Sequence, residues 1–174
     1  MTETSFRTAT AQDIDALRRF ERGIVSAERA FDRTLKAGEV HYYDIENMVS
    51  AEHVRFLVAE RGGELVGCGF ARIDDAKPYL EHSRQAYLGL MYVDPKHRRQ
   101  SINEAILELL KQWCRAQGVT ELRLEVYNDN AVALRAYEKA GFSKHMIEMR
   151  VRLDDVSDEK YPAVPPGPAG VLSA

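Results

Sequence analysis

Residues 124–142, LEVYNDNAVALRAYEKAGF, are the stretch that decides the fold of this 174-residue chain. They continue an alternating apolar pattern that begins at Leu122, and this pattern predicts a strand over residues 122–126. A polar turn then leads into a helical pattern over residues 128–140, which Gly141 is placed to end as a C-terminal cap. The stretch therefore predicts one strand followed directly by one helix.

Three polar side chains can meet where this strand joins this helix. Asn130 and Tyr137 are two helical turns apart in sequence, so they lie on the same helix face. Glu125 comes at the end of the preceding strand. A carboxylate, an amide and a phenol at one place could carry out acid–base chemistry. Taken singly, Tyr137 also fits a core aromatic residue and Glu125 a surface strand residue, and both alternatives stay open.

A second polar stretch, YVDPKHRRQSIN at residues 92–103, also runs from a strand into a helix. Free backbone N–H groups and the positive end of the helix dipole make such a turn suited to binding phosphate. Arg98 and Arg99 could add charge-assisted hydrogen bonds. The alternative is a solvated basic turn that begins the helix with a capping box formed by Ser101 and Glu104.

Apolar periodicity predicts the remaining elements, and their order predicts the fold class. Residues 87–93 are almost continuously apolar, which is typical of a central strand buried on both faces. Together the elements predict an α/β (α+β) fold with a central mixed β-sheet flanked by helices. The other predicted elements are a strand over 5–10, a helix beginning at Thr10, one or two helices within 25–51, strands over 54–59 and 65–73 with a turn at 62–63, a helix with apolar positions 106, 109, 110 and 113 that ends at Gly118, and a last strand over 147–153.

The composition is that of one soluble globular domain, with 45% hydrophobic residues and a formal net charge of −3. We expect a domain over residues 1–153 and a Pro-rich, acidic, flexible tail over 154–174. Without the tail, basic and acidic residues are equal in number, so we expect no nucleic-acid partner.

The same sequence carries no sign of a membrane, secretory or metal-binding segment. No apolar run reaches the roughly 20 residues that span a bilayer, and the N-terminus does not resemble a secretory signal. Two isolated cysteines, Cys68 and Cys114, fit a reducing compartment, so we expect a cytoplasmic protein. The histidines lack the spacing of metal ligands, so no metal is expected.

The two polar stretches together resemble the GNAT superfamily of N-acetyltransferases. Residues 124–142 are similar to that family's late strand–helix motif, N-x-x-A followed by a tyrosine and a GF ending. The basic stretch takes the place of the family's acyl-CoA pyrophosphate loop, and LGLMYVDP at 88–95 is similar to its central strand. With the hairpin GGELVGCGFARI at 62–73, the resemblance covers residues 54–153 and implies a GNAT-like acyl-CoA N-acyltransferase fold.

The resemblance also implies acetyl-CoA as co-substrate and assigns roles to residues of this chain. The main chain at Met91 and Val93 would pair with the pantetheine amides, and Asn130, with Ala133 of the N-x-x-A motif, would hold the pantetheine arm. Tyr137 would contact the cofactor and protonate the departing CoA thiolate. The loop residues that would hold the pyrophosphate are Arg98, Arg99, Gln100, Ser101, Ile102 and Asn103.

Glu125 matches the general base of the family's ribosomal-protein alanine N-acetyltransferase branch. An unperturbed glutamate is a weak base, so burial or a water chain would have to assist it. The acceptor pocket could be lined by Glu28, Arg29, Phe31, Tyr42, Tyr43 and Tyr79, which could equally be ordinary surface residues.

The basic loop departs from the family pattern, because Arg99, Ser101 and Asn103 stand where glycines are usual. If these positions need positive φ, each Cβ costs roughly 1–2 kcal/mol, whereas a helical loop would carry no such strain.

The expected function is transfer of an acetyl group from acetyl-CoA to a primary amine, on a small molecule or peptide, by direct attack in a ternary complex. A homodimer is a further expectation from the resemblance. The alternatives are a non-catalytic acyl-CoA-binding or regulatory domain, and a protein-interaction module that uses the tail.

Overall fold

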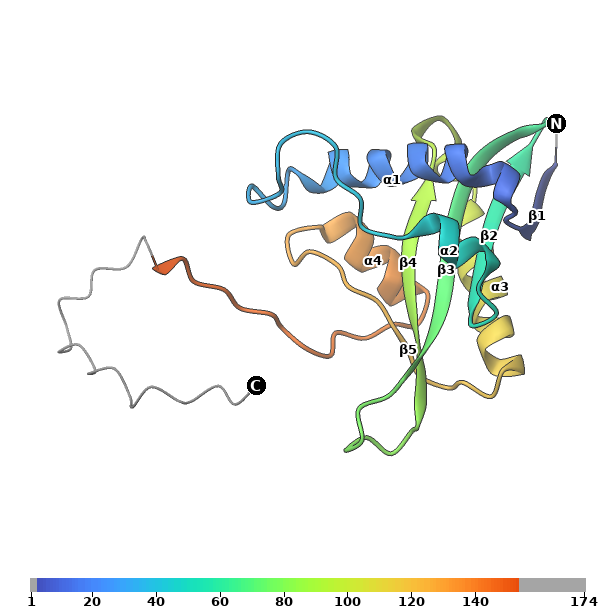
Figure 1. Cartoon of the computed structure of the whole chain (residues 1–174). Helices are drawn as coiled ribbons and strands as arrows, with labels where there is room; N and C mark the ends of the chain where they lie inside the picture. Colours follow the sequence, from blue (N-terminus) through green and yellow to red (C-terminus); the bar gives the residue numbers. More distant parts are fainter. Residues whose placement is uncertain (1–2, 154–174) are drawn as a thin grey trace, which may run out of the picture. The chain divides into compact units, whose positions relative to one another are not determined.

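Five strands form one sheet in their sequence order within the described part of the chain (Figure 1). Neighbours from β1 to β4 are antiparallel, whereas β4 and β5 are parallel, so the predicted mixed sheet is confirmed. The computed structural model describes residues 3–153, and the predicted tail over 154–174 lies outside them. The strands are β1 (Thr4–Thr8), β2 (Val54–Arg61), β3 (Glu64–Asp75), β4 (Arg84–Val93) and β5 (Leu122–Arg123).

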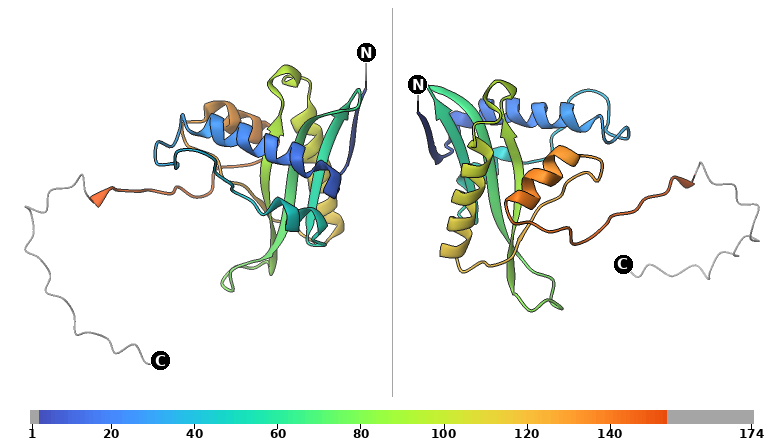
Figure 2. Two further views of the ribbon diagram at one scale, coloured as in Figure 1. Left: turned by 45° about the horizontal axis from the view of Figure 1, so that its top comes forward. Right: turned by 180° about the vertical axis from the view of Figure 1, so that it is seen from behind.

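Helices cover both faces of this sheet (Figures 1 and 2). Helices α1 and α2 lie on one face, and α3 and α4 lie on the other. The prediction of one or two helices within 25–51 reduces to the end of α1 and to α2, and residues 29–44 are irregular. Among residues 3–153 no helix combines the length and apolarity that crossing a bilayer requires. The helices are α1 (Ile14–Glu28), α2 (Ile45–Ser50), α3 (Ile102–Ala116) and α4 (Ala131–Lys139), with 3-10 turns at Ala11–Asp13 and Pro95–His97.

Alternation along the strands divides the core into two layers. Phe56 and Val58 of β2 pack with the α1 and α2 layer, whereas Leu57 and Ala59 pack with α3. The predicted apolar position Ile106 of α3 is fully buried in the second layer. Each large apolar side chain buried in this way contributes about 1.5–3 kcal/mol, so both helix layers are held to the sheet mainly by apolar packing.

Strand β4 contains a bulge at its centre. Cys68 of β3 pairs with Tyr92 and Phe70 pairs with Gly89, so β4 has one residue more than β3 between these pairs. Leu90, inside this segment, has a φ of 47°, which is the left-handed region. A β-bulge bends its strand and increases the local twist. The bulge therefore changes the direction of β4 in the middle of the sheet.

Strand β5 is shorter than the sequence predicts. It pairs with β4 only at Leu122 and Arg123, opposite Ala86 and Tyr87. The predicted strand over 122–126 is thus wrong beyond Arg123, because β4 bends at its bulge and the chain after β5 turns into the loop that precedes α4. The alternation persists in sequence because Leu122 and Leu124 still pack on the apolar core.

Residues 143–153 are the described part of a second unit, which begins after Phe142. The strand predicted over 147–153 is absent, since no backbone partner pairs with these residues in the described range. Their apolar side chains are 69% to 89% exposed at Ile147, Met149, Val151 and Leu153. This segment therefore has the alternating sequence of a strand but pairs with no strand of the described residues.

Candidate active site

The second half of β4 exposes backbone groups along one edge. Asp94 N–H donates to Val66 O on β3 at 2.9 Å. Because backbone groups alternate along a strand, the N–H and C=O groups of Val93 and Met91 point away from β3. Strand β5 does not extend along this edge, and on that side Val93 O accepts a weak bond of 3.4 Å from Arg98 Nε. The two residues predicted to pair with an amide-bearing ligand thus lie on a strand edge beyond the end of β5.

The basic loop after β4 contains two strained residues. Arg99 has a φ of 60° and Ser101 a φ of 57°, both left-handed. These are two of the three positions where a glycine was noted as missing, and the third, Asn103, lies in α3 with ordinary helical geometry. The capping box that belongs to the alternative interpretation of this stretch is absent, because Ser101 in this conformation makes no side-chain capping hydrogen bond. The loop therefore has, at Arg99 and Ser101, the positive φ angles that glycine adopts most easily.

The loop directs charged side chains outward and one apolar side chain inward. Arg98, Arg99 and Gln100 are exposed, and Gln100 Oε1 accepts a hydrogen bond from Arg61 of β2. Ile102 is 3% exposed and packs in the core, so only its backbone can reach a ligand.

Glu104, in the first turn of α3, forms an ion pair of 3.5 Å with Lys139 of α4. This pairing offsets part of the repulsion that Glu104 would exert on a phosphate at the same helix end.

Asn130 is the N-cap residue of α4. Its Oδ1 accepts a hydrogen bond of 3.1 Å from Ala133 N, so the Asn130 carbonyl and the Ala133 N–H satisfy each other. The Asn130 amide NH₂ remains as the group that can donate to a ligand. The N–H of Ala133 is already used in this hydrogen bond, so Ala133 could contact a ligand only through its methyl side chain.

Tyr137 is half-buried on α4. Its ring makes an edge contact with Phe142 at 5.9 Å between centroids, and both pack on the α3 side of the core. Burial, with smaller contributions from Tyr43 and Glu28, raises the pKa of the Tyr137 phenol to about 12. Tyr137 is thus both a packing residue and a phenol that stays protonated near neutral pH.

Glu125 is exposed on the loop that follows β5. Burial of Tyr87 on β4 raises the pKa of its phenol, and the charge of Glu125 raises it further. Tyr87 therefore lies within electrostatic range of the candidate base Glu125, which the sequence does not predict because Tyr87 stands inside the apolar run of the central strand.

The suggested acceptor residues separate into two groups. Glu28, Tyr42 and Tyr43 interact with one another electrostatically, and Phe31 stacks on Tyr127 with centroids 5.9 Å apart. The remaining two lie apart from this network, because Arg29 donates to loop carbonyl oxygens, including that of Gly38 at 2.8 Å, and Tyr79 is 76% exposed.

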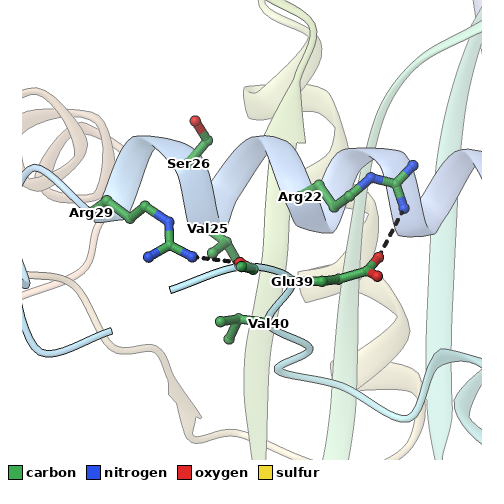
Figure 3. A pocket seen from close by; sticks show the side chains of 7 residues that line it. Arg22, Val25, Ser26, Arg29, Glu39 and Val40 are labelled. Atoms are coloured by element: carbon green, nitrogen blue, oxygen red, sulfur yellow. Dashed lines mark hydrogen bonds and ion pairs between the residues drawn. The ribbon is translucent and has the colours of Figure 1, made fainter. Parts of the chain in front are cut away.

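A surface pocket of about 430 Å³ lies between α1 and the loop after it (Figure 3). Arg22 and Glu39 pair across it at 3.7 Å, and Arg29 reaches the Gly38 carbonyl. None of the residues predicted to bind the cofactor or to catalyse lines it. The pocket is lined by Arg22, Val25, Ser26, Arg29, Gly38, Glu39 and Val40.

The two cysteines and the metal-binding side chains offer no further site in the described range. Cys68 and Cys114 are buried free thiols, and burial raises the pKa of both, that of Cys114 to about 11. Within residues 3–153 no group of three His, Cys, Asp or Glu side chains could hold a metal ion.

Comparison with known proteins agrees with this architecture. The chain is 31% identical over 141 residues to an IAA acetyltransferase from Azospirillum brasilense. The aligned segment covers 81% of each protein. Solved structures under 25% identical share the fold. A predicted acetyltransferase from Clostridium acetobutylicum, solved with acetyl-CoA, is 18% identical with a TM-score of 0.68 and covers 88% of this chain and 99% of its own. An aminoglycoside N-acetyltransferase in complex with CoA is 16% identical with a TM-score of 0.67 and covers 87% and 95%.

The family model of the acetyltransferase (GNAT) family matches residues 22–142, which is most of the described unit that holds the sheet. That match includes β4, the basic loop and α4 with Tyr137. The chain belongs to the acetyltransferase (GNAT) family.

Proposed function

We propose that this chain is an N-acetyltransferase that transfers the acetyl group of acetyl-CoA to a primary amine by direct attack in a ternary complex. The observation that carries the proposal is the edge of β4 at Met91 and Val93, which extends beyond the end of β5 towards the basic loop. An edge whose outward N–H and C=O groups pair with no neighbouring strand in the described range suits a ligand whose long arm contains amides. The relative from Azospirillum brasilense, an acetyltransferase by name, also supports it.

The cofactor would bind along this edge and the adjoining loop. Met91 and Val93 would pair with the pantetheine amides through their main chain, and the Asn130 amide NH₂ would donate to the same arm. The pyrophosphate would be held by backbone N–H groups at the start of α3 and by nearby side chains, because helix N-termini and arginines both attract phosphate. The residues of this loop are Arg98, Arg99, Gln100, Ser101, Ile102 and Asn103.

Chemistry would begin with a neutral amine attacking the thioester carbonyl carbon. A backbone N–H of β4 would polarise the carbonyl oxygen, the C–S bond would break, and the acetyl group would remain on nitrogen as an amide. Tyr137 would donate its proton to the leaving sulfur, for which a phenol that stays protonated is suited. Glu125 would accept the proton of the amine through water, since its exposure leaves it in contact with solvent.

The experiment that tests this function is the substitution Tyr137→Phe, which removes one hydroxyl group and keeps the ring. Loss of a general acid lowers turnover by about 10²–10⁴-fold, so kcat should fall by at least 100-fold while acetyl-CoA affinity stays unchanged. Tyr79→Phe, at an exposed tyrosine, is the matched control and should leave kcat unchanged. Equal activity of Tyr137→Phe and the wild type would refute the assignment of the acid.

The second candidate is a non-catalytic domain that binds acyl-CoA, which the two strained non-glycine residues of the basic loop favour. Wild-type protein that binds acetyl-CoA but transfers no acetyl group to any amine of a broad panel would support this candidate.

We also propose that the chain forms a homodimer. The support is the exposed alternating apolar sequence at Ile147, Met149, Val151 and Leu153, because a segment with this pattern can pair as an added strand with the sheet edge of a second copy. Light scattering after size exclusion should give twice the chain mass, and Ile147→Lys with Met149→Lys should give the monomer mass. A wild-type monomer at 50 to ~100 μM, which exceeds the Kd of a stable dimer, would contradict this proposal.

We further propose that the protein works in the cytoplasm, without nucleic-acid or membrane partners. Two buried free thiols support a reducing compartment, and the near-neutral charge gives no basic surface for nucleic acid. Fractionation of cells that express the chain should recover it with soluble cytoplasmic proteins.

A further inference from the structure

Glu28, the last residue of α1, is a half-buried carboxylate without a basic partner. It takes part in no ion pair of the described residues. Its neighbour Arg29 points elsewhere and donates to the carbonyl oxygens of Lys36 and Gly38 at 2.8 Å each. Burial raises the pKa of the Glu28 carboxyl, and no neighbouring cation lowers it again. A half-buried carboxylate without such a partner lacks the positive charge that would stabilise its ionised form.

Tyrosines from several elements lie within electrostatic range of this carboxylate. The Tyr42 hydroxyl oxygen is buried and makes no hydrogen bond of normal geometry with a described residue, although it lies near the Glu28 carboxylate and shifts its pKa. Tyr43, Tyr87 on β4 and Tyr137 on α4 are all close enough for the Glu28 charge to raise their pKa values. We call Glu28 and these four tyrosines the Glu28 cluster.

Buried hydrogen bonds hold the cluster in place. Glu21 of α1 is fully buried, and its Oε1 accepts the N–H groups of Tyr42 at 2.8 Å and of Tyr43 at 3.0 Å. Burial raises the pKa of Glu21, but the hydrogen bonds from the 41–43 segment and from Arg18 outweigh burial and hold that pKa below its usual range. The loop segment that carries Tyr42 and Tyr43 is thereby fixed to α1.

The cluster reaches the bulge of β4, the strand whose backbone is proposed above to polarise the thioester carbonyl. The Leu90 backbone and the Tyr87 side chain both lie close enough to the Tyr43 hydroxyl to affect its pKa, which burial raises above its usual range. An added Cβ on Gly89 would lie 2.9 Å from the Tyr43 hydroxyl oxygen, so this ring packs directly on the β4 backbone. Among residues 3–153, the cation that contacts a ring of the cluster is Arg72, which lies over Tyr87 at 5.4 Å and is paired with Asp74.

We propose that the Glu28 cluster is the acceptor site and that it selects a primary amine on a planar apolar body without a carboxylate. The inference rests on the proposed function, since it names the acceptor of that reaction. An ammonium group supplies the positive partner that the Glu28 carboxylate lacks. The tyrosine rings offer flat apolar surfaces and cation–π contacts. A carboxylate on the acceptor would be repelled by Glu28 and by Glu125, so amino acids are poor acceptors.

The test compares phenethylamine with phenylalanine, which share ring and amine and differ by the carboxylate. CoA release should give a kcat/KM at least 100-fold higher for phenethylamine. Glu28→Gln keeps the shape of the side chain and removes its charge, so it should raise the KM for phenethylamine at least tenfold. The ratio of kcat/KM for phenethylamine to that for phenylalanine should also be smaller in this variant than in the wild type. Its acetyl-CoA affinity should not change. Glu64→Gln, at an exposed glutamate of the β2–β3 turn, is the control and should behave as wild type.

Calorimetric titration of the chain with phenethylamine alone separates this inference from the proposed function. Binding by the wild type that weakens at least tenfold in Glu28→Gln supports the inference even if no acetyl group is transferred. Suppose that the chain binds acetyl-CoA and transfers acetyl groups, but acts faster on phenylalanine or has the same kinetics in Glu28→Gln as in the wild type. This result overturns the inference and leaves the acetyltransferase proposal standing. Failure of phenethylamine to bind the wild type, with or without acetyl-CoA, also overturns it.

Discussion

The substitution Ser101→Gly should stabilise this protein, although most substitutions to glycine destabilise. Ser101 precedes α3 in the left-handed conformation, with a φ of 57° and a ψ of 14°. Its side chain is exposed and makes no capping hydrogen bond, so the substitution removes no contact of that kind.

The size of the effect follows from two opposing contributions. A non-glycine residue in the left-handed region loses about 1–2 kcal/mol, which glycine recovers. Glycine also gives the unfolded chain more freedom, which opposes folding by about 0.5–1 kcal/mol. The free energy of unfolding should therefore rise by about 0.5–1 kcal/mol. Ser26→Gly is the matched control, because Ser26 lies within helix α1, and there the same change should lower stability by about 0.5 kcal/mol.

Urea unfolding measures both variants against the wild type. The single tryptophan, Trp113, is half-buried on α3 with Arg55 above its ring, so its fluorescence reports on the helix that Ser101 precedes. With a slope of about 2 kcal/mol per molar, the unfolding midpoints of the two variants should differ by about half a molar. A loss of stability in Ser101→Gly as large as that in Ser26→Gly would refute the left-handed conformation.

Two further predictions concern the core and the ion pair at the start of α1. Gly89→Ala should lower the free energy of unfolding by about 1–3 kcal/mol, because the new Cβ would lie 2.5 Å from Phe70 Cζ. Urea unfolding measures this change, and an unchanged midpoint would show that the Phe70 ring moves freely. Asp13 is buried and accepts two hydrogen bonds from Arg7, which lower its pKa from 3.8 to about 2. A carboxyl whose folded pKa is lowered stabilises the fold above its unfolded pKa, and that contribution is lost as the pH falls from about 4 to 2. Since Arg7 is 41% exposed, Asp13→Asn should cost about 1–2 kcal/mol at pH 7 and should reduce the acid sensitivity in that range; equal acid sensitivity of variant and wild type would contradict the assignment.

Patterns that depend on neighbours in sequence predicted most of the fold. The helix of α4 and its end at Gly141, which has a φ of 92°, follow from periodicity and from the conformational freedom of glycine. The turn at 62–63 and the buried central strand follow in the same way. The family motif then placed β4, the basic loop and Tyr137 in one region.

Features that depend on tertiary geometry were not predicted. The bulge at Leu90 and the early end of β5 arise from how β4 bends within the sheet, which apolar alternation does not report. The left-handed conformations of Arg99 and Ser101 occur at residues that rarely adopt them, so propensity argues against them. Tyr87 was assigned to the core because its apolar neighbours conceal the hydroxyl group.

Calorimetric titration of the purified chain with acetyl-CoA, repeated with the double variant Arg98→Ala and Arg99→Ala, tests whether this protein binds the co-substrate through its basic loop. We expect micromolar binding by the wild type that weakens at least tenfold in the variant, because two charge-assisted contacts to the pyrophosphate are removed. No detectable binding of acetyl-CoA by the folded wild type would contradict the proposed acetyltransferase function.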